Sequence, residues 1–530
     1  MQETVLQESV LRAAGLKQAG DWKRRGSRGF LMAGLVVALA TLTGGCGNQY
    51  RPVVSAINPV GPAGQPTKYA VAISNPSTYP NNTVTGLITF VDVSGDTVLS
   101  TPSLGGASVE TPAVAGTGLF FPAPTTPGTA TVAPSPVFVN PNNFELNNSG
   151  SEAFVVNGQG QFTDFGVGNP QSLLTQNIVL TQLGGAPNGV QTFSLPTTGT
   201  TIFVPQPTAP QSISELEIAA APSLLQNLAV PNPVYVVGTD SALRVYAISS
   251  NGAGNGTVYP IENTPVSIDT GNILQVGVNP VYGVMTADGN RAFILNNKGT
   301  GLANSGTVSV INVKNNGLDS GTPTITLPAT VNGVTSAPNP VWADFNTLNS
   351  EMVVLNQGDG VHPGSLSVIS IPLCNANTQV TNPNCNAANP VDAAGFGTII
   401  FTVPVGINPT MVSVLADGTR AYVVNQGILP SGSNPGVEGS VSVVNLNSGV
   451  VTQTIAAIST PLGTLTAASS PTLIYGHPNT ISATTGSPTG KVYVTSSDNE
   501  FLSIIETDTD TVDTHISLQG LGVRVLVTAK

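Results

Sequence analysis

The chain is poor in the residues that usually carry chemistry. Charged residues make up only 8% of its 530 residues, against about 25% in typical soluble domains. The three histidines and three cysteines form neither an H-E-x-x-H nor a C-x-x-C motif, which excludes the commonest zinc-site patterns. No G-x-S-x-G turn accompanies a suitable Asp and His, so a serine hydrolase of that type is not indicated. We therefore expect the three histidines to be structural or solvated: His362, His477 and His515.

Basic residues are also scarce. The chain has 16 Lys and Arg residues against 28 Asp and Glu residues. Six of the basic and three of the acidic residues lie in the first 45 positions, which leaves 10 and 25 and a net charge of −15 beyond them. No block of Lys or Arg remains that could follow a phosphate backbone, so nucleic acid is not expected as a partner.

Aromatic residues amount to 5% of the chain, and Trp342 is the only tryptophan beyond residue 45. This low content argues against a stacked platform for sugars or bases. Asp508, Asp510 and Asp513 place three carboxylates at close spacing, but the glycine and the distal glutamate of a calcium loop are missing. We expect a solvated turn between two strands there. No catalytic residue, no cofactor and no metal ligand is predicted.

The N-terminus is of a different kind. Six basic residues precede an uncharged stretch, residues 30–45, which is too short to span a bilayer comfortably and is typical of a signal peptide. It ends in Thr43-Gly44-Gly45-Cys46, which resembles the lipobox of bacterial lipoproteins, although Leu42 lies one residue further back than usual. The sequence thus predicts a lipoprotein signal peptide over 1–45, lipidation of Cys46 and a tether over 46–65. The alternative is ordinary signal cleavage with Cys46 incidental.

Two cysteines remain beyond Cys46. Cys374 and Cys385 flank one Asn-rich loop, and in an exported protein such a pair most often forms a disulfide. Closing a loop of this size would contribute about 3 kcal/mol in the chain-entropy model. A metal pair would need further ligands, which the loop lacks.

A repeat dominates the second half of the chain. An Asn-Pro step, an apolar run and a second apolar run ending in Asn recur over residues 279–296, 339–356 and 408–425, the first and last copies with an Asp-Gly turn between the runs. Glycine supplies the positive φ that such a turn needs. A third run with small alternating residues follows, as in 306–313 and 439–446, and then a fourth. Four antiparallel strands per unit predict the blades of an all-β propeller.

The repeat resembles that of the YVTN-type β-propeller proteins, which are related to surface-layer and YncE-like propellers. Residues 491–496 (Lys-Val-Tyr-Val-Thr-Ser) match the second strand of that pattern, and residues 501–507 match the third. The resemblance is strong over 270–530 and weaker over 66–269, where 89–93 and 243–248 are interpreted as degenerate third strands. It implies a propeller over 66–530 and says little about activity.

Third-strand candidates predict seven blades, with six or eight as alternatives. The final strand, 523–527, is expected to pair with 69–73 and close the ring, which would also cover a sheet edge. Loops rich in Gly, Asn, Pro and Ser, such as 357–363 and 426–438, are expected to form the binding faces. The predicted blades are 66–115, 116–200, 201–265, 266–332, 333–403, 404–463 and 464–530.

Three functions are compatible with the sequence. The first is a non-catalytic binding or scaffold protein of the cell envelope, exported and lipid-anchored in the periplasm or at the outer surface, with an envelope or extracellular protein or glycan as partner. The second is a hydrolase of the seven-bladed lactonase type, for which Arg244 and His477 would be the residues to find in the central channel. The third is a surface-layer or adhesion component.

Overall fold

The computed structural model describes residues 68–75, 86–100, 140–167, 180–195, 199–218, 222–240, 242–298, 306–331, 334–335, 338–372, 395–459, 472–484 and 490–528. All of them belong to one compact unit, Pro66–Lys530. Within these ranges the chain is all β, and no helix there could cross a membrane. The predicted signal peptide, the tether, Cys46, Cys374 and Cys385 lie outside the described residues.

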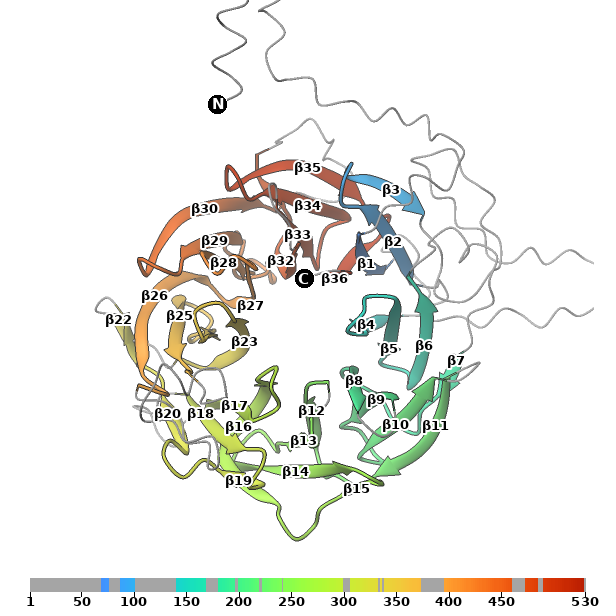
Figure 1. The fold of residues 1–530 in the computed structure, drawn as a ribbon. Coiled ribbons are helices and arrows are strands. Elements are labelled where there is room, and N and C mark those ends of the chain that lie inside the picture. The colour runs from blue at the N-terminus through green and yellow to red at the C-terminus, as the bar shows by residue number, and fades with distance from the viewer. Residues whose placement is uncertain are drawn as a thin grey trace, which may run out of the picture. The chain divides into compact units, whose positions relative to one another are not determined.

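The described strands form a β-propeller of eight blades, each an antiparallel sheet that runs outward from the centre (Figure 1). From the inner strand outward, the first four blades are β36 (Leu521–Val527), β1 (Tyr69–Asn75), β2 (Leu87–Asp92) and β3 (Thr97–Ser100); β4 (Pro141–Leu146), β5 (Glu152–Asn157), β6 (Gln161–Gly166) and β7 (Leu180–Gln182); β8 (Gln191–Leu195), β9 (Gly199–Gln206), β10 (Ser212–Ile218) and β11 (Pro222–Leu228); and β12 (Pro233–Val237), β13 (Arg244–Ser249), β14 (Asn255–Asn263) and β15 (Val266–Ile268).

The remaining blades carry the strong repeats. They are β16 (Leu274–Met285), β17 (Arg291–Lys298), β18 (Thr307–Asn312), β19 (Gly317–Leu318) and β20 (Thr324–Thr326); β23 (Pro340–Asn346), β24 (Glu351–Asn356), β25 (Pro363–Ser370) and β26 (Ile399–Ile407); β27 (Pro409–Val414), β28 (Arg420–Asn425), β29 (Ser440–Asn445) and β30 (Val450–Ile458); and β32 (Pro478–Ala483), β33 (Lys491–Ser496), β34 (Phe501–Glu506) and β35 (Thr511–Ser517). The fourth and fifth blades share one sheet because β14 also pairs with β16. Three short strands complete the set: β21 (Thr330–Val331) pairs with β22 (Val334–Thr335), and β31 (Ile474–Tyr475) pairs with β30.

The predicted count of seven blades was therefore one too low, although the four-stranded propeller itself is confirmed. Residues 191–228 form a complete blade, which the predicted boundary at 200/201 divided. This blade has neither the Asn-Pro step nor the Asp-Gly turn, so its strands gave no repeat signal. The run 243–248 was also misassigned: it belongs to β13, the second strand of its blade, whereas 89–93 does belong to a third strand, β2.

The predicted closure of the ring is confirmed. The C-terminal strand β36 pairs antiparallel with β1, with Ala70 opposite Val527, Val71 opposite Leu526 and Ala72 opposite Val525. The first blade thus takes its inner strand from the end of the chain and its other strands from the beginning. This pairing covers the edge of β1 that would otherwise expose unpaired backbone groups.

A β-bulge recurs on the inner strands. Six of them contain a proline, which is the first residue of the strand in five. In five of the six the residue before the proline is an Asn with φ between 42° and 52°, a left-handed conformation that Asn tolerates better than most residues. The register shifts between each proline, or Gly522 in β36, and the second residue after it. A bulge of this kind re-aims a side chain. We call the re-aimed residues the ring positions: Asn143, Tyr235, Tyr282, Trp342, Met411, Thr480 and Arg524.

The second strands end in buried polar residues that explain the repeated Asn. The amide of Asn296 donates to the hydroxyls of Thr307 and Ser309, both at 3.0 Å. Asn356 and Asn425 make the same pair of bonds to the third strands of their own blades. A buried amide needs such partners, so the Asn of the second strand and the alternating small hydroxyl residues of the third form one structural unit.

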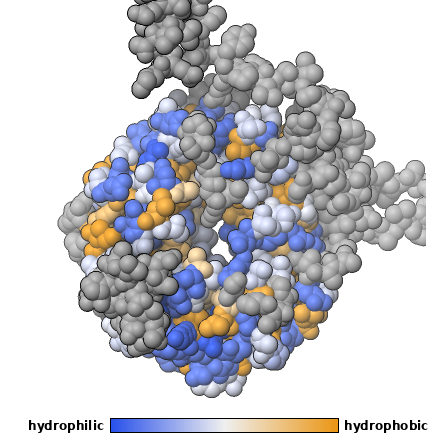
Figure 2. Space-filling model, viewed as in Figure 1, coloured by the Kyte–Doolittle hydropathy of each residue, from blue (hydrophilic) through white to orange (hydrophobic). Residues whose placement is uncertain are grey.

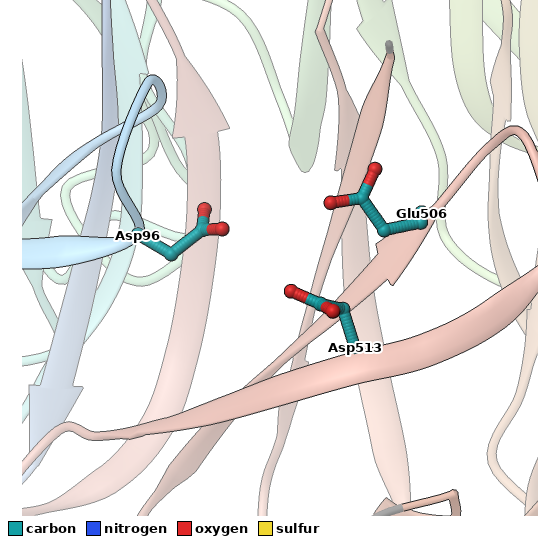
Figure 3. A group of neighbouring side chains, drawn as sticks. All are labelled: Asp96, Glu506 and Asp513. Atoms are coloured by element: carbon teal, nitrogen blue, oxygen red, sulfur yellow. The ribbon is translucent and has the colours of Figure 1, made fainter. Parts of the chain in front are cut away.

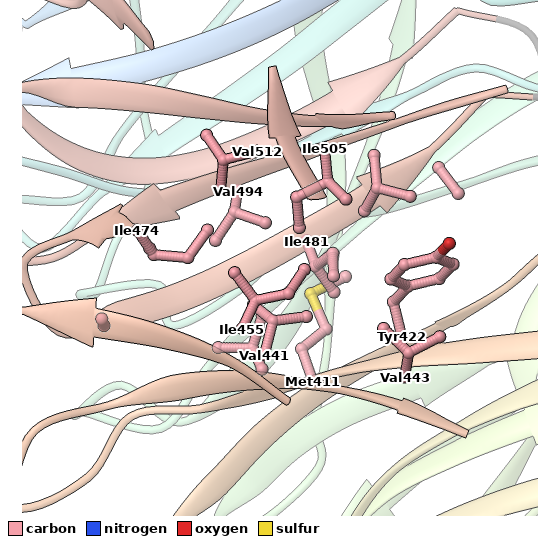
Figure 4. Packing of buried hydrophobic residues seen from close by; sticks show 14 of the residues in the cluster. Met411, Tyr422, Val441, Val443, Ile455, Ile474, Ile481, Val494, Ile505 and Val512 are labelled. Atoms are coloured by element: carbon pink, nitrogen blue, oxygen red, sulfur yellow. The ribbon is translucent and has the colours of Figure 1, made fainter. Parts of the chain in front are cut away.

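Apolar side chains fill the space between neighbouring blades. Between the seventh and eighth blades, Met411 and Tyr422 pack against Ile481 and Val494, all of them at most 7% exposed (Figure 4). Each sheet buries both faces in this way, which is why the second strands are nearly continuous apolar runs and do not alternate in polarity. The blades are therefore mutually dependent for their cores.

Polar joints connect the blades at the start of the second strands. Arg420 donates to the carboxylate of Asp510 at 2.5 Å and to the Thr507 carbonyl at 2.7 Å, and Tyr422 also donates to Asp510. Asp510 lies in the next blade, in a turn where it adopts φ 54°. Related joints link Tyr246 with Asn316, and Lys491 and Tyr493 with Asp96.

In the second blade an acidic residue, Glu152, stands where four other second strands begin with Arg or Lys. Burial raises the pKa of Glu152, and the charge of Asp164 adds to the rise; burial likewise raises the pKa of Asp164. A carboxyl with a raised pKa in the folded state contributes stability below its unfolded pKa of about 4, and this contribution is lost as the pH rises through the raised value.

We therefore expect Glu152→Gln to raise the free energy of unfolding at neutral pH by about 0.5–1 kcal/mol, a modest gain because the site is partly exposed. Below the ordinary carboxyl pKa range the variant and the parent should converge. Urea unfolding at neutral and mildly acidic pH measures this. Equal stability of the two proteins at neutral pH would show that the two carboxyls do not oppose folding.

Candidate binding site in the central channel

The inner strands surround an opening at the centre of the ring (Figures 1 and 2). Ring positions of three successive blades place Tyr235, Tyr282 and Trp342 beside one another on β12, β16 and β23. The ring centroids of Tyr235 and Tyr282 are 4.6 Å apart, and those of Tyr282 and Trp342 are 4.3 Å apart and nearly parallel, at 19°. All three side chains are partly exposed. They form an aromatic arc along the channel wall.

Arg524 faces this arc from the opposite side. It occupies the ring position of β36 and donates to Asn143 at 2.5 Å and to the Glu145 carboxylate at 3.3 Å. Its guanidinium carbon lies 5.8 Å from the centroid of the Trp342 ring. Because the seventh and eighth blades separate β36 from β23, this contact crosses the opening. We call the six residues the channel cluster: Asn143, Glu145, Tyr235, Tyr282, Trp342 and Arg524.

The two phenols of the channel cluster are neutral. Desolvation raises the pKa of Tyr235 to about 12, and the charge of Glu145 adds to this while Arg524 opposes it. Desolvation also holds the pKa of Tyr282 well above its usual value, and the interaction with Tyr235 adds to the rise. At neutral pH both hydroxyls are therefore protonated and serve as hydrogen-bonding groups, not as bases.

The channel cluster is suited to recognition. It offers π surface, an amide, two neutral hydroxyls, one guanidinium and one carboxylate, and a few polar groups in an otherwise apolar wall are typical of binding sites. Arg524 and Glu145 neutralise each other as an ion pair, 12% and 29% exposed. A general base would need a free group with a pKa near the operating pH, and no histidine belongs to the cluster.

Arg244 and His477, the residues considered for a lactonase site, are engaged elsewhere. Arg244 lies on the second strand β13 and pairs with Glu262 on the third strand β14 at 2.7 Å. The His477 side chain is 1% exposed, and its Nδ1 lies 2.6 Å from a carboxylate oxygen of Asp498 within the same blade. Neither residue contacts the channel cluster in the contacts that the described residues make.

The other two histidines also lie away from the cluster. His362 is exposed in a loop of the sixth blade, where its Nδ1 is 2.7 Å from Asp359. The backbone N–H and ring of His362 lower the pKa of that carboxyl to about 2. His515 is on the outer strand β35, stacked on Tyr475 with centroids 3.9 Å apart and 3.1 Å from the Ser503 hydroxyl. The structural or solvated role expected for all three stays a prediction.

The three aspartates weighed as a calcium loop do not form one group. Asp508 is exposed in the turn between β34 and β35, and Asp510 holds the Arg420 joint. Asp513 lies instead near Asp96 and Glu506, with oxygens of the three within 4.8 Å of one another (Figure 3). The ammonium of Lys491 pairs with Asp96 and lies 4.0 Å from Glu506. This group therefore belongs to the joint that closes the ring between the eighth and first blades.

The predicted binding loop 426–438 is an ordered hairpin. Ile428 pairs with Val437 and Ser431 pairs with Asn434. Leu429 and Val437 are exposed, at 44% and 41%. Its role as a binding face stays a prediction.

The channel cluster was missed from the sequence, although a signal for it exists. In three copies of the repeat the second residue after the proline is aromatic: Pro233-Val234-Tyr235, Pro280-Val281-Tyr282 and Pro340-Val341-Trp342. A low overall aromatic content hides such a pattern, because what matters is that the residues share one repeat position. Pairing of 523–527 with 69–73, which was predicted, would also have placed Arg524 on an inner strand.

No protein-family model and no curated protein matches this sequence. Solved structures do resemble the fold. The dihydro-heme d1 dehydrogenase NirN in complex with DHE aligns with a TM-score of 0.51 at 10% identity, over 86% of this chain and 74% of that one. Apo AztD from Citrobacter koseri aligns with a TM-score of 0.47 at 10% identity, over 87% and 97%. The periplasmic gluconolactonase PpgL of Pseudomonas aeruginosa aligns with a TM-score of 0.42 at 17% identity, over 73% and 95%. At 10% identity, the likeness to NirN shows the propeller fold and nothing of the activity.

Proposed function

We propose that this protein is a non-catalytic binding protein of the cell envelope that holds its ligand at the channel cluster. The observation that carries the proposal is the cluster itself: six residues from five blades are linked by hydrogen bonds and ring contacts, and Tyr282 and Arg524 both contact Trp342. An ion pair and three aromatic side chains are not needed at these positions to close a propeller, because the same positions in the seventh and eighth blades hold Met411 and Thr480. Ligand recognition would explain why the channel cluster has these polar and aromatic residues.

The remainder of the proposal rests on the sequence. The predicted signal peptide and Cys46 support export and lipid anchoring. The buried Asn and hydroxyl unit gives a physical reason for the motif that resembles the YVTN-type repeat, and we propose membership of that group. The partner is an envelope or extracellular protein or glycan.

A lactonase-type hydrolase is the second candidate. Arg244 and His477 make other contacts, so a version of it would have to use Glu145 and Arg524, the charged pair on the inner strands. Their mutual pairing disfavours this version, because a paired carboxylate is a poor base. A surface-layer role is the third candidate, and a persistent monomer in light scattering would argue against it.

The test combines a pull-down from an envelope extract with a lactone hydrolysis assay, both on residues 47–530. We expect a specific partner and no turnover. Tyr282→Ala should weaken capture about tenfold or more, whereas Tyr259→Ala, a matched change on the third strand β14, should not. Turnover that Glu145→Gln abolishes would make the protein an enzyme. Capture that both tyrosine variants retain equally would place the binding surface outside the channel.

A further inference from the structure

The Trp342 ring already has two neighbours within the channel cluster. Tyr282 stacks against Trp342, and the guanidinium of Arg524 lies over the Trp342 ring. A sugar or a base would need an open ring face to stack on. The π surface of Trp342 instead faces a cation, and tryptophan is the side chain that binds cations best in this way.

The remaining groups around that cation also suit a guanidinium. Glu145 supplies a carboxylate and Asn143 an amide oxygen, both accepting hydrogen bonds from Arg524. The charge of Arg524 partly opposes the rise in pKa that desolvation causes at Tyr235 and Tyr282. A carboxylate, a neutral acceptor and an aromatic face are the groups that hold guanidinium ions in proteins.

Arg524 does not satisfy all of its own hydrogen-bond donors at this site. Among the described residues its Nε is buried and has no hydrogen-bond partner. The backbone of β36 is held by its pairing with β1. A buried donor without a partner is costly, and a separate ligand that is free to adjust its position would avoid that cost.

We propose that the channel cluster is a cation cage that selects organic cations of the guanidinium class, and that Arg524 occupies it in the ligand-free ring. A guanidinium-bearing ligand, such as an arginine side chain of an envelope protein, replaces the Arg524 side chain between Glu145 and Trp342. The inference rests on the proposed function, since it names the ligand chemistry of the same site.

The test uses the single tryptophan of the site as its probe. The sequence has two tryptophans, so Trp22→Phe in the full-length chain leaves Trp342 as the only one. Adding Arg524→Ala vacates the cage, and ethylguanidinium at millimolar concentration, far below denaturing levels, is titrated against Trp342 fluorescence. We expect a saturable change with an affinity about tenfold or more above that of the chain retaining Arg524.

Matched controls decide what the signal means. Arg244→Ala removes an arginine outside the channel and should behave like the parent. Ethylurea, similar in shape and uncharged, should give no saturable change, and Glu145→Gln added to Arg524→Ala should weaken ethylguanidinium binding about tenfold. Should Arg524→Ala lose its cooperative thermal transition, Arg524→Met retains the side-chain volume and replaces it.

A non-saturable response in both Arg524 variants, or equal binding of ethylurea, would overturn the cage. So would saturable binding of a methyl glycoside in place of the cation. These outcomes are independent of the envelope pull-down: capture without ethylguanidinium binding would refute the ligand class alone, and ethylguanidinium binding without capture would refute the proposed partner alone.

Discussion

Deletion of residues 521–530, which include the whole of β36, is expected to abolish cooperative folding of the propeller. The strand is the inner member of the first blade and buries Val525, Leu526 and Val527 in the cores shared with the neighbouring second and eighth blades. At roughly 1.5–3 kcal/mol for each buried side chain, their loss costs roughly 5–9 kcal/mol. That is comparable with the whole stability of a typical domain, about 5–15 kcal/mol. Thermal unfolding followed by circular dichroism measures the effect.

Two comparisons separate ring closure from general damage. A synthetic peptide of residues 519–530 added to the truncated chain should restore the transition, because it can pair with β1 as β36 does. Leu526→Asp should destabilise strongly, whereas Leu225→Asp, at a side chain 50% exposed on the outer strand β11, should change little. A truncated chain that unfolds as cooperatively as the parent would mean that the first blade does not depend on β36.

The sequence predicted the parts of this fold that depend on short, local sequence patterns. The strand-like run at 523–527 has no later strand to pair with, and its pairing with 69–73 closes the ring as expected. The second blade retains an Ala-Phe-Val-Val-Asn run at 153–157, on its second strand β5, of the same kind as those in the strong repeats. Strand pairing in a blade is between chain neighbours, so local patterns are sufficient for it.

No local sequence pattern marks the third blade, and none shows which residues of the channel cluster contact one another. β8 to β11 are recognisable only by their place between two other blades, because no Asn-Pro step or Asp-Gly turn marks them. The contact of Arg524 with Trp342 joins positions far apart in sequence and exists only because eight blades close at that diameter. A residue's repeat position can be read from the sequence, but what lies across the channel depends on the number of blades.

The joint at Asp510 should be the most sensitive single position outside the cores. Its carboxylate accepts hydrogen bonds from Arg420 and Tyr422 of the preceding blade, and both Arg420 and Asp510 are largely buried, at 23% and 19% exposure. Asp510→Ala leaves the guanidinium and the phenol without their acceptor, which costs about 3 kcal/mol when discounted for the remaining exposure. It also places alanine at a positive φ of 54°.

Asp510→Asn separates these contributions. Asparagine tolerates the same φ and keeps an acceptor oxygen, so this variant should lose only the charge interaction, about 1–2 kcal/mol. Asp508→Ala, in the same turn but exposed, is the matched control and should remain within about 0.5 kcal/mol of the parent. Urea unfolding of the three variants, with Arg420→Met to complete a double-mutant cycle, gives the coupling energy. A cost for Asp510→Ala no greater than that for Asp508→Ala would show that the seventh and eighth blades are held together by their apolar core alone.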